Sequence, residues 1–146
     1  MQPSDSHIWL DIKNLDRHNA DEATDRLDSL TKTYNIDKNR LVTESGNIDA
    51  LDSLDDAGYY TAHYVSNVKP EKLTDEEEAE LYASIETALS RHVADALSFP
   101  VWWYNEMKEF TSTTKDTIDF LVWEHRTTQL EFSSRQAAKK YLKTLK

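Results

Sequence analysis

Acidic residues recur at helical spacing in three segments of the chain. Asp21, Asp25 and Asp28 fall on one side of a predicted helix and span roughly 10 Å, given the helical rise per residue. Duplex DNA places one phosphate about every 3.4 Å along each strand, so the two charge spacings are comparable. The other acidic candidates lie on two further predicted helices and are Asp52, Asp55, Asp56, Asp75, Glu76, Glu77 and Glu80. These faces favour contact with a basic protein surface, or serve only as an ordinary solubilising surface.

The five histidines show no spacing typical of a metal site. A common helical site needs ligands at positions i and i+4, and the closest histidines, His7 and His18, are 11 residues apart. His92 falls within the apolar stripe of a helix predicted to end near Leu97, and Glu78 lies on the same side over its first turns. This favours either a hydrogen-bonded core histidine or a pocket in which His92 moves a proton or orients a ligand. We predict no metal site and no cofactor, with the pocket around His92 and Glu78 as an alternative.

Three large aromatic residues, Trp102, Trp103 and Tyr104, follow one another in segment 99–116. The sequence leaves the conformation of this segment open between helix and strand. Three consecutive aromatic side chains cannot all face one core, so at least one meets a neighbouring element, a partner or solvent. Trp and Tyr are frequent anchors of protein interfaces, which predicts an aromatic anchor for a partner protein. A covered core segment or a homodimer contact is the alternative.

Composition excludes several classes of protein. The chain has 146 residues, no Cys and two Gly. The lack of Cys removes disulfides, thiolate metal sites and cysteine nucleophiles, and the isolated Gly46 and Gly58 form neither a P-loop nor a dinucleotide-binding motif. No apolar run approaches the length of a membrane span, and residues 1–11 lack the pattern of a secretory signal. We predict a cytoplasmic protein that binds no membrane and, with a net charge of −10, no nucleic acid directly.

The elements that must position these residues are predicted as one α+β domain over residues 1–146. A small antiparallel sheet is expected, with the last two strands forming a hairpin. The strands of this sheet are His7–Ile12, Tyr59–Val65, Thr117–His125 and Gln129–Phe132. Arg40–Glu44 is a further candidate strand.

The sheet is expected to pack against about three amphipathic helices. The first begins after Asn19, an N-cap residue, and the last covers Ser134–Leu145. The strongest prediction is a helix that begins at a capping box of Thr74 and Glu77 and is stopped before Pro100. Ile48–Ala57 is a shorter candidate helix.

The prediction of function rests on the uneven distribution of charge along the chain. Residues 1–100 contain 21 acidic and 9 basic residues, while residues 101–146 contain 6 and 8. We predict a non-catalytic acidic protein-interaction module, an inhibitor or adaptor that binds a basic protein surface, with mimicry of DNA as its more specific version. One alternative is a small-ligand binder or enzyme with the pocket around His92. Another is a homo-oligomeric structural protein.

Overall fold

Residues 7–114 and 117–124 are described by a computed structural model. Within them, five β-strands alternate with four α-helices. The strands are β1 (Ile8–Asp11), β2 (Leu41–Ser45), β3 (Tyr60–Tyr64), β4 (Ala96–Pro100) and β5 (Asp119–Trp123). The helices are α1 (Ala20–Tyr34), α2 (Ile48–Asp56), α3 (Asp75–Ser90) and α4 (Tyr104–Ser112). Among the helices of these ranges, none is both long and apolar enough to cross a bilayer.

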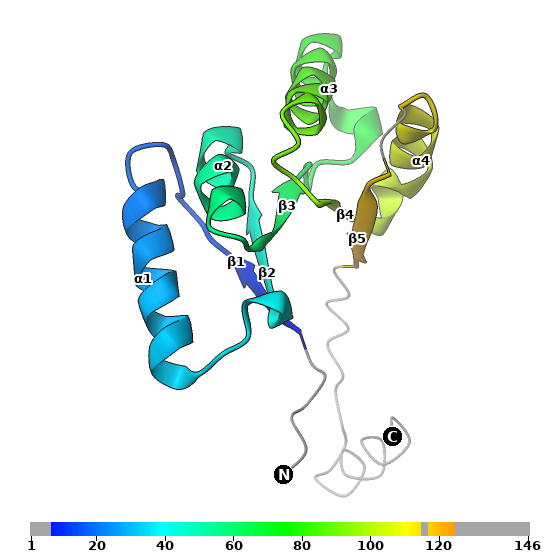
Figure 1. Cartoon of the computed structure of the whole chain (residues 1–146). Helices are drawn as coiled ribbons and strands as arrows, with labels where there is room; N and C mark the ends of the chain where they lie inside the picture. Colours follow the sequence, from blue (N-terminus) through cyan, green and yellow to red (C-terminus); the bar gives the residue numbers. More distant parts are fainter. Residues whose placement is uncertain (1–6, 115–116, 125–146) are drawn as a thin grey trace, which may run out of the picture.

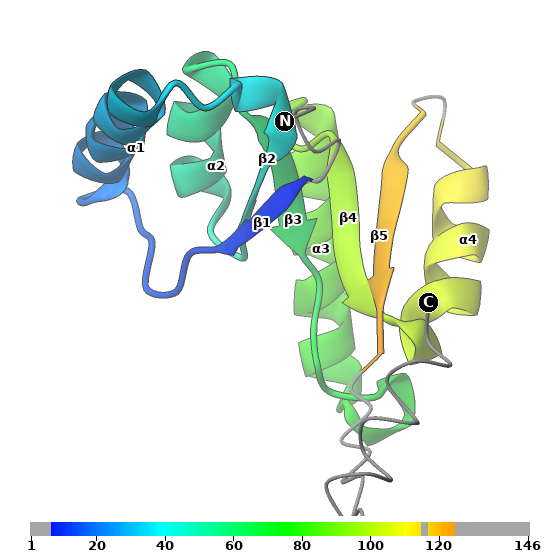
Figure 2. The same cartoon turned by 90° about the horizontal axis from the view of Figure 1, so that it is seen from below.

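The five strands form one parallel sheet in the order β1-β2-β3-β4-β5. One helix connects each strand to the next. Parallel crossovers are right-handed and this strand order never reverses, so the four helices belong on the same face of the sheet. Figure 1 shows them in an arc around one side of the curled sheet, and Figure 2 shows the same arc from below. The arrangement is a Rossmann-like α/β fold with its described helices on the convex side.

The prediction of an antiparallel sheet is wrong, because all four described strand pairings are parallel. The direction of pairing follows from the connections. Each described strand is followed by a helix that returns the chain to the same end of the sheet, which is the geometry of a parallel crossover. The predicted strand Thr117–His125 is present as β5, but it pairs with β4. Its expected hairpin partner Gln129–Phe132 and the predicted helix Ser134–Leu145 lie outside the described residues.

Helix α3 begins where the sequence predicts and ends earlier. Thr74 Oγ1 accepts a hydrogen bond from the Glu77 backbone N–H at 3.3 Å, and Glu77 Oε2 accepts one from the Thr74 N–H at 2.8 Å. This confirms the capping box. The predicted end is wrong: the helix stops at Ser90, His92 adopts a left-handed φ of 55°, and Ala96–Pro100 forms β4. All five β4 residues are buried, so the strand shows no alternation that would distinguish it from a helical stripe.

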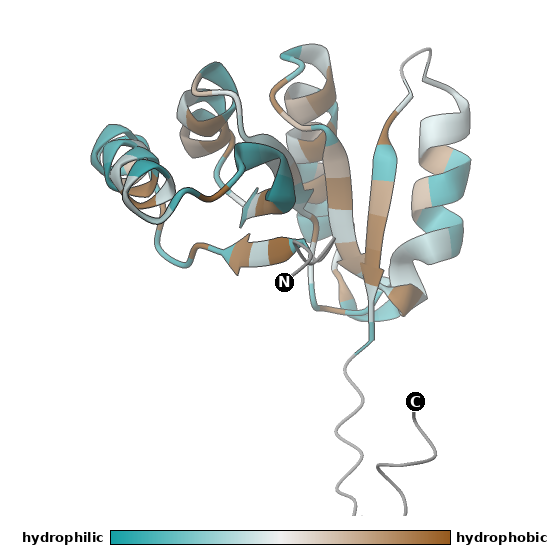
Figure 3. Ribbon diagram, turned by 60° about the horizontal axis from the view of Figure 1, so that its bottom comes forward, coloured by the Kyte–Doolittle hydropathy of each residue, from teal (hydrophilic) through white to brown (hydrophobic). Residues whose placement is uncertain are grey.

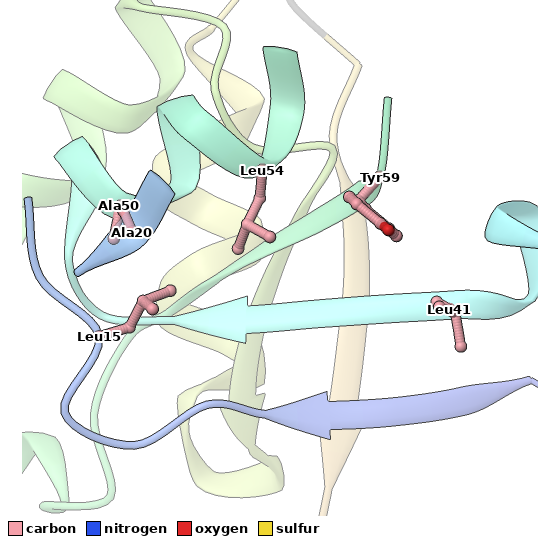
Figure 4. Close-up of a cluster of buried hydrophobic side chains, with 6 residues drawn as sticks. All are labelled: Leu15, Ala20, Leu41, Ala50, Leu54 and Tyr59. Atoms are coloured by element: carbon pink, nitrogen blue, oxygen red, sulfur yellow. The ribbon is translucent and has the colours of Figure 1, made fainter. Parts of the chain in front are cut away.

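Two main apolar clusters fill the space between the helices and the sheet. The first lies under α1 and α2 (Figure 4) and is built from Leu15, Ala20, Leu41, Ala50, Leu54 and Tyr59. The second joins α3 and α4 to β4 and consists of Ile85, Leu89, Leu97, Phe99, Trp103 and Met107. Figure 3 shows that apolar residues predominate in β4 and β5, whereas hydrophilic and apolar residues are mixed along the helices. Burial of these side chains is the main favourable contribution to folding.

The strand register assigns each strand residue to one of two faces. Residues paired across parallel strands point the same way, and successive residues point to opposite faces. Thr43 and Thr61 are paired on the face that the helices cover. The row Asp11, Glu44 and Ala62 lies on the opposite face. We call this opposite face the concave face.

Candidate functional site

The concave face has a patch of small residues on β3 and β4, with larger residues around it. Ala62 of β3 is paired with Glu44 on one side and with Ala96 on the other, and Tyr64 is paired with Ser98. The small side chains of this patch leave room for the longer side chains around it to converge above them. The large members of this face are Trp9, Glu44, Tyr60, Tyr64, Leu121 and Trp123.

A pocket of about 350 Å³ opens where the strands end. Asp11, Tyr64 and Trp123 are the last residues of their strands, and Glu44 is the last but one of β2. In open parallel sheets, ligands characteristically bind at the carboxyl ends of the strands. This position therefore makes the pocket the leading candidate site, and it is lined by Trp9, Asp11, Lys13, Glu44, Tyr64, Asn67 and Trp123.

Glu44 is the buried acid of this pocket, with 4% of the residue exposed. Its Oε2 accepts a hydrogen bond from the Trp9 indole N–H at 3.0 Å. Burial raises the pKa of Glu44, the hydrogen bond from Ser98 lowers it, and the negative charge of Asp11 raises it again. The balance is a raised pKa. A carboxyl group in this setting holds its proton over a wider pH range than an exposed glutamate and can exchange it with a ligand.

A hydrogen-bonded relay crosses the centre of the concave face. The Trp123 indole N–H donates to Ser98 Oγ at 3.2 Å, and the Ser98 side chain is hydrogen bonded to Glu44. Glu44 belongs to β2 and Ser98 to β4, so the carboxyl group reaches across β3 at the position of Ala62. Two indole groups and one hydroxyl thereby fix the position of the carboxyl group before any ligand arrives.

The mouth of the pocket carries an ion pair beside aromatic rings. Lys13 Nζ lies 2.5 Å from Asp11 Oδ2 and 6.0 Å from the centroid of the Tyr64 ring. The hydrogen bond with Asp11 raises the pKa of Lys13, so the amine stays charged. The rings of Tyr64 and Trp123 are nearly parallel, at 13°, with centroids 6.4 Å apart. The pocket thus offers charged donors and acceptors next to flat apolar walls.

The structure places His92 away from Glu78. His92 is exposed in the turn after α3, whereas Glu78 is exposed in the first turn of that helix. His92 does border a cavity of about 350 Å³ at the amino ends of the strands, with Asp95 and Asp119 in its wall. Glu78 is not among the residues of that wall. The predicted placement of His92 on an apolar stripe is wrong because the helix ends before it, and a ligand at His92 stays a prediction.

Part of the predicted acidic face of α1 is used inside the protein. Asp28 Oδ1 accepts a hydrogen bond from the Tyr59 hydroxyl at 2.5 Å and lies 2.8 Å from Lys38 Nζ. The hydrogen bond from Lys38 lowers the pKa of Asp28. Asp21 accepts a hydrogen bond from a serine of α2, and Asp25 is exposed. The carboxylates of this face are therefore shared between the fold and the surface.

The acids of α2 are similarly divided. The two terminal nitrogens of Arg91 lie 2.7 Å from Asp49 and 2.7 Å from Asp52, which ties the end of α3 to α2. Asp55 is half-buried, and burial raises its pKa. Asp56 is exposed.

On α3, Glu77 is held in the capping box, and hydrogen bonds from Thr74 lower its pKa. Asp75, Glu76 and Glu80 are exposed at the amino end of the helix, where carboxylates favour the helix dipole. Binding of a basic protein, and mimicry of DNA, stay predictions.

The predicted aromatic anchor is divided between the core and the surface. Trp103 is fully buried, and its indole N–H donates to the Val68 carbonyl at 2.9 Å. Trp102 is half-buried beneath Lys69, whose Nζ lies 5.8 Å from the ring centroid. Tyr104 is 42% exposed. Trp103 thus belongs to the core, while contact of Trp102 and Tyr104 with a partner stays a prediction.

The central residues of the concave pocket were missed by sequence reasoning. Glu44 lies in a strand that the sequence proposes only as a candidate, and Ser98 lies in β4, whose first two residues the sequence assigns to the end of a helix. A usable signal is present in the strands that end in the pocket. Trp9 and Asp11, at alternate positions of β1, share a face on which Ala62, Ala96 and Ser98 are small.

Within residues 7–114 and 117–124, no group of three or more His, Asp or Glu side chains is placed to hold a metal ion. The chain matches no protein-family model, and searches of curated proteins and of solved structures also give no match. The function is therefore inferred from the residues of the site.

Proposed function

We propose that the protein binds a small, neutral, hydroxyl-rich molecule, a monosaccharide or a polyol, in the pocket at the carboxyl ends of its strands. The observation that carries this proposal is the buried carboxyl group of Glu44, fixed by Trp9 and Ser98 at the base of an aromatic pocket. Small-molecule sites are typically apolar hollows with a few precisely placed polar groups.

The charges of the pocket favour a neutral ligand. Lys13 carries a positive charge at the mouth, which opposes a cationic ligand. Asp11 beside it and Glu44 below oppose an anionic one. A hydroxyl group is both a donor and an acceptor, so it can bind Lys13 and either carboxyl group without an unpaired charge.

The walls favour a ligand with an apolar face. Sugar rings present C–H groups on their faces and hydroxyl groups at their edges. The flat rings of Trp9, Tyr64 and Trp123 supply apolar area, and the polar groups of the pocket supply partners for the edge. A preformed carboxyl position lowers the ordering cost of binding.

The test is a titration of the protein with methyl β-glucoside, myo-inositol and glycerol, followed by NMR shifts of the indole N–H groups of Trp9 and Trp123. We expect at least one of these probes to bind, and Glu44→Gln to weaken that binding roughly 10-fold or more, since an NH2 group that can only donate replaces a carboxyl oxygen that accepts hydrogen bonds. Glu80→Gln, which neutralises an exposed acid on α3, is the matched control and should bind as the wild type does.

Two results would contradict the proposal. One is unchanged affinity in Glu44→Gln. The other is binding of choline or inorganic phosphate in this pocket without binding of any neutral probe.

A further inference from the structure

A second cavity, of about 410 Å³, lies on the same concave face. It is displaced from the first towards the amino ends of the strands, where Val42 and Tyr60 sit in the first half of β2 and β3. Trp9 lines both cavities, so the two adjoin at its ring. The lining of the second cavity is His7, Trp9, Asn39, Val42, Tyr60 and Leu121.

The two cavities differ in chemistry. The first contains the charged groups of Asp11, Lys13 and Glu44, whereas the second contains no acidic or basic side chain among its described residues except His7. The hydroxyl of Tyr60 donates its proton to Asp119 at 2.7 Å, so it has no further proton to donate to a ligand. The wall formed by Trp9, Val42, Tyr60 and Leu121 is therefore predominantly apolar.

The register and the curl of the sheet explain this apolar wall. Trp9, Val42 and Tyr60 form one row across β1, β2 and β3. Leu121 comes from β5, on the opposite edge of the sheet, and lines the same cavity. An apolar side chain from each edge of the sheet thus lines this second hollow, which shares Trp9 with the polar pocket.

We infer that the ligand is an amphiphile: a hydroxyl-rich head group in the pocket of Glu44, joined to an alkyl chain that passes Trp9 and fills the second cavity. This inference rests on the proposed function, since the head group is the ligand proposed there. Trp9 suits the junction, because its indole N–H is hydrogen bonded to Glu44 on the polar side and its ring lines the apolar side.

The test uses two series of probes below their critical micelle concentrations: methyl, butyl, hexyl and octyl β-glucoside, and glycerol with its butyl, hexyl and octyl ethers. Each buried CH2 group is expected to tighten binding about fourfold until the second cavity is filled. Affinity is measured by calorimetry on the full chain, and the site by NMR shifts of the Trp9 indole N–H.

Two variants separate the tail from the head. Leu121→Asn places a polar group of similar size in the second cavity, and should remove most of the gain from chain length while methyl β-glucoside or glycerol binds as before. Val42→Thr has nearly the same shape as the wild type and should reduce the gain in the same direction. It keeps the test decisive if Leu121→Asn fails to fold.

The outcomes distinguish the inference from the proposed function. Equal affinity along the series, with binding still weakened by Glu44→Gln, overturns the amphiphile and leaves the head-group site in place. The inference is also overturned if affinity rises with chain length as steeply in Leu121→Asn and in Val42→Thr as it does in the wild type. Insensitivity of all probes to Glu44→Gln overturns the proposed function itself, and absence of any binding overturns both.

Discussion

The two faces of the sheet are built from alternate residues of the same short strands, yet they differ in almost every physical respect. On the convex face, Leu97 and Phe99 are fully buried against helices in an apolar cluster. On the concave face, the neighbouring Ser98 joins a relay that ends at a buried carboxyl group. One face therefore supplies most of the apolar burial that stabilises the fold, while the other carries the polar and aromatic groups of the pocket.

A buried histidine on one face and a buried glutamate on the other respond to pH in opposite directions. His63 faces α3, where Ser84 Oγ lies 3.3 Å from its Nε2, and burial lowers the pKa of His63 to about 4. Glu44 faces the pocket, and burial raises its pKa. In both groups the neutral form is favoured. His63 therefore lowers the stability of the fold in acid, where it must take up a proton, whereas Glu44 lowers it at higher pH, where it must lose one.

The largest expected effect comes from truncating one tryptophan on each face. Trp103→Ala should lower the free energy of unfolding by about 3–5 kcal/mol, because the side chain is fully buried in the convex cluster. Trp9→Ala should cost only about 1–2 kcal/mol, because its residue is 42% exposed, while it abolishes ligand binding. Urea unfolding followed by circular dichroism measures both. Equal losses of stability in Trp103→Ala and Trp9→Ala would contradict the conclusion that the convex face supplies most of the stabilising burial.

The next effect is acid destabilisation through His63. The pKa of His63 lies below its ordinary value of 6.5, so the stability that the neutral ring contributes is present above pH 6.5 and is lost as pH falls towards 4. Across this window the wild type should lose about 3 kcal/mol relative to His63→Gln. Urea unfolding at half-unit pH steps measures this, with His92→Asn as a control at an exposed histidine. Parallel pH curves for the wild type and His63→Gln would contradict it.

The smallest effect has the opposite sign and belongs to Glu44. The pKa of Glu44 lies above its ordinary value of 4.5, so its contribution is fully present below pH 4.5 and is lost as pH rises through the folded-state pKa. Glu44→Gln should therefore gain stability relative to the wild type between pH 4.5 and neutrality. The same urea titrations show this, and Glu80→Gln should show no such trend. If Glu44→Gln instead became less stable relative to the wild type as pH rises, the charged form of Glu44 would be the favoured one.

Sequence patterns predicted those elements whose signals are local. The alternation in β1, the β-forming residues of β3 and the capping box of α3 were sufficient for those elements. The buried strand β4 was missed, because apolar residues without alternation suit a helix stripe as well as a strand covered on both faces. The predicted antiparallel pairing of the strands was wrong for a related reason. Without β4, the repeated order of strand and helix that signals parallel crossovers was incomplete.

The site depends on positions that no local pattern reveals. Glu44 and Ser98 are 54 positions apart in the chain and meet because Ala62 of the intervening strand is small. The candidate acids that sequence reasoning selected lie on helices, where Asp28 and Asp52 form ion pairs that stabilise contacts between elements. Register across three strands decides which acid is buried, and register emerges only from the assembled sheet.

The sequential order of the strands also has a consequence for how the chain assembles. Every pairing in the described sheet joins strands that are consecutive in the sequence, so each strand can dock on its predecessor as soon as its helix has formed. Growth in this manner needs no late closure between strands that are far apart in the sequence, because each pairing closes only one strand–helix crossover at a time. During synthesis, β1, α1 and β2 can form a first unit before the later strands leave the ribosome, with the edge of each newest strand serving as the template for the next.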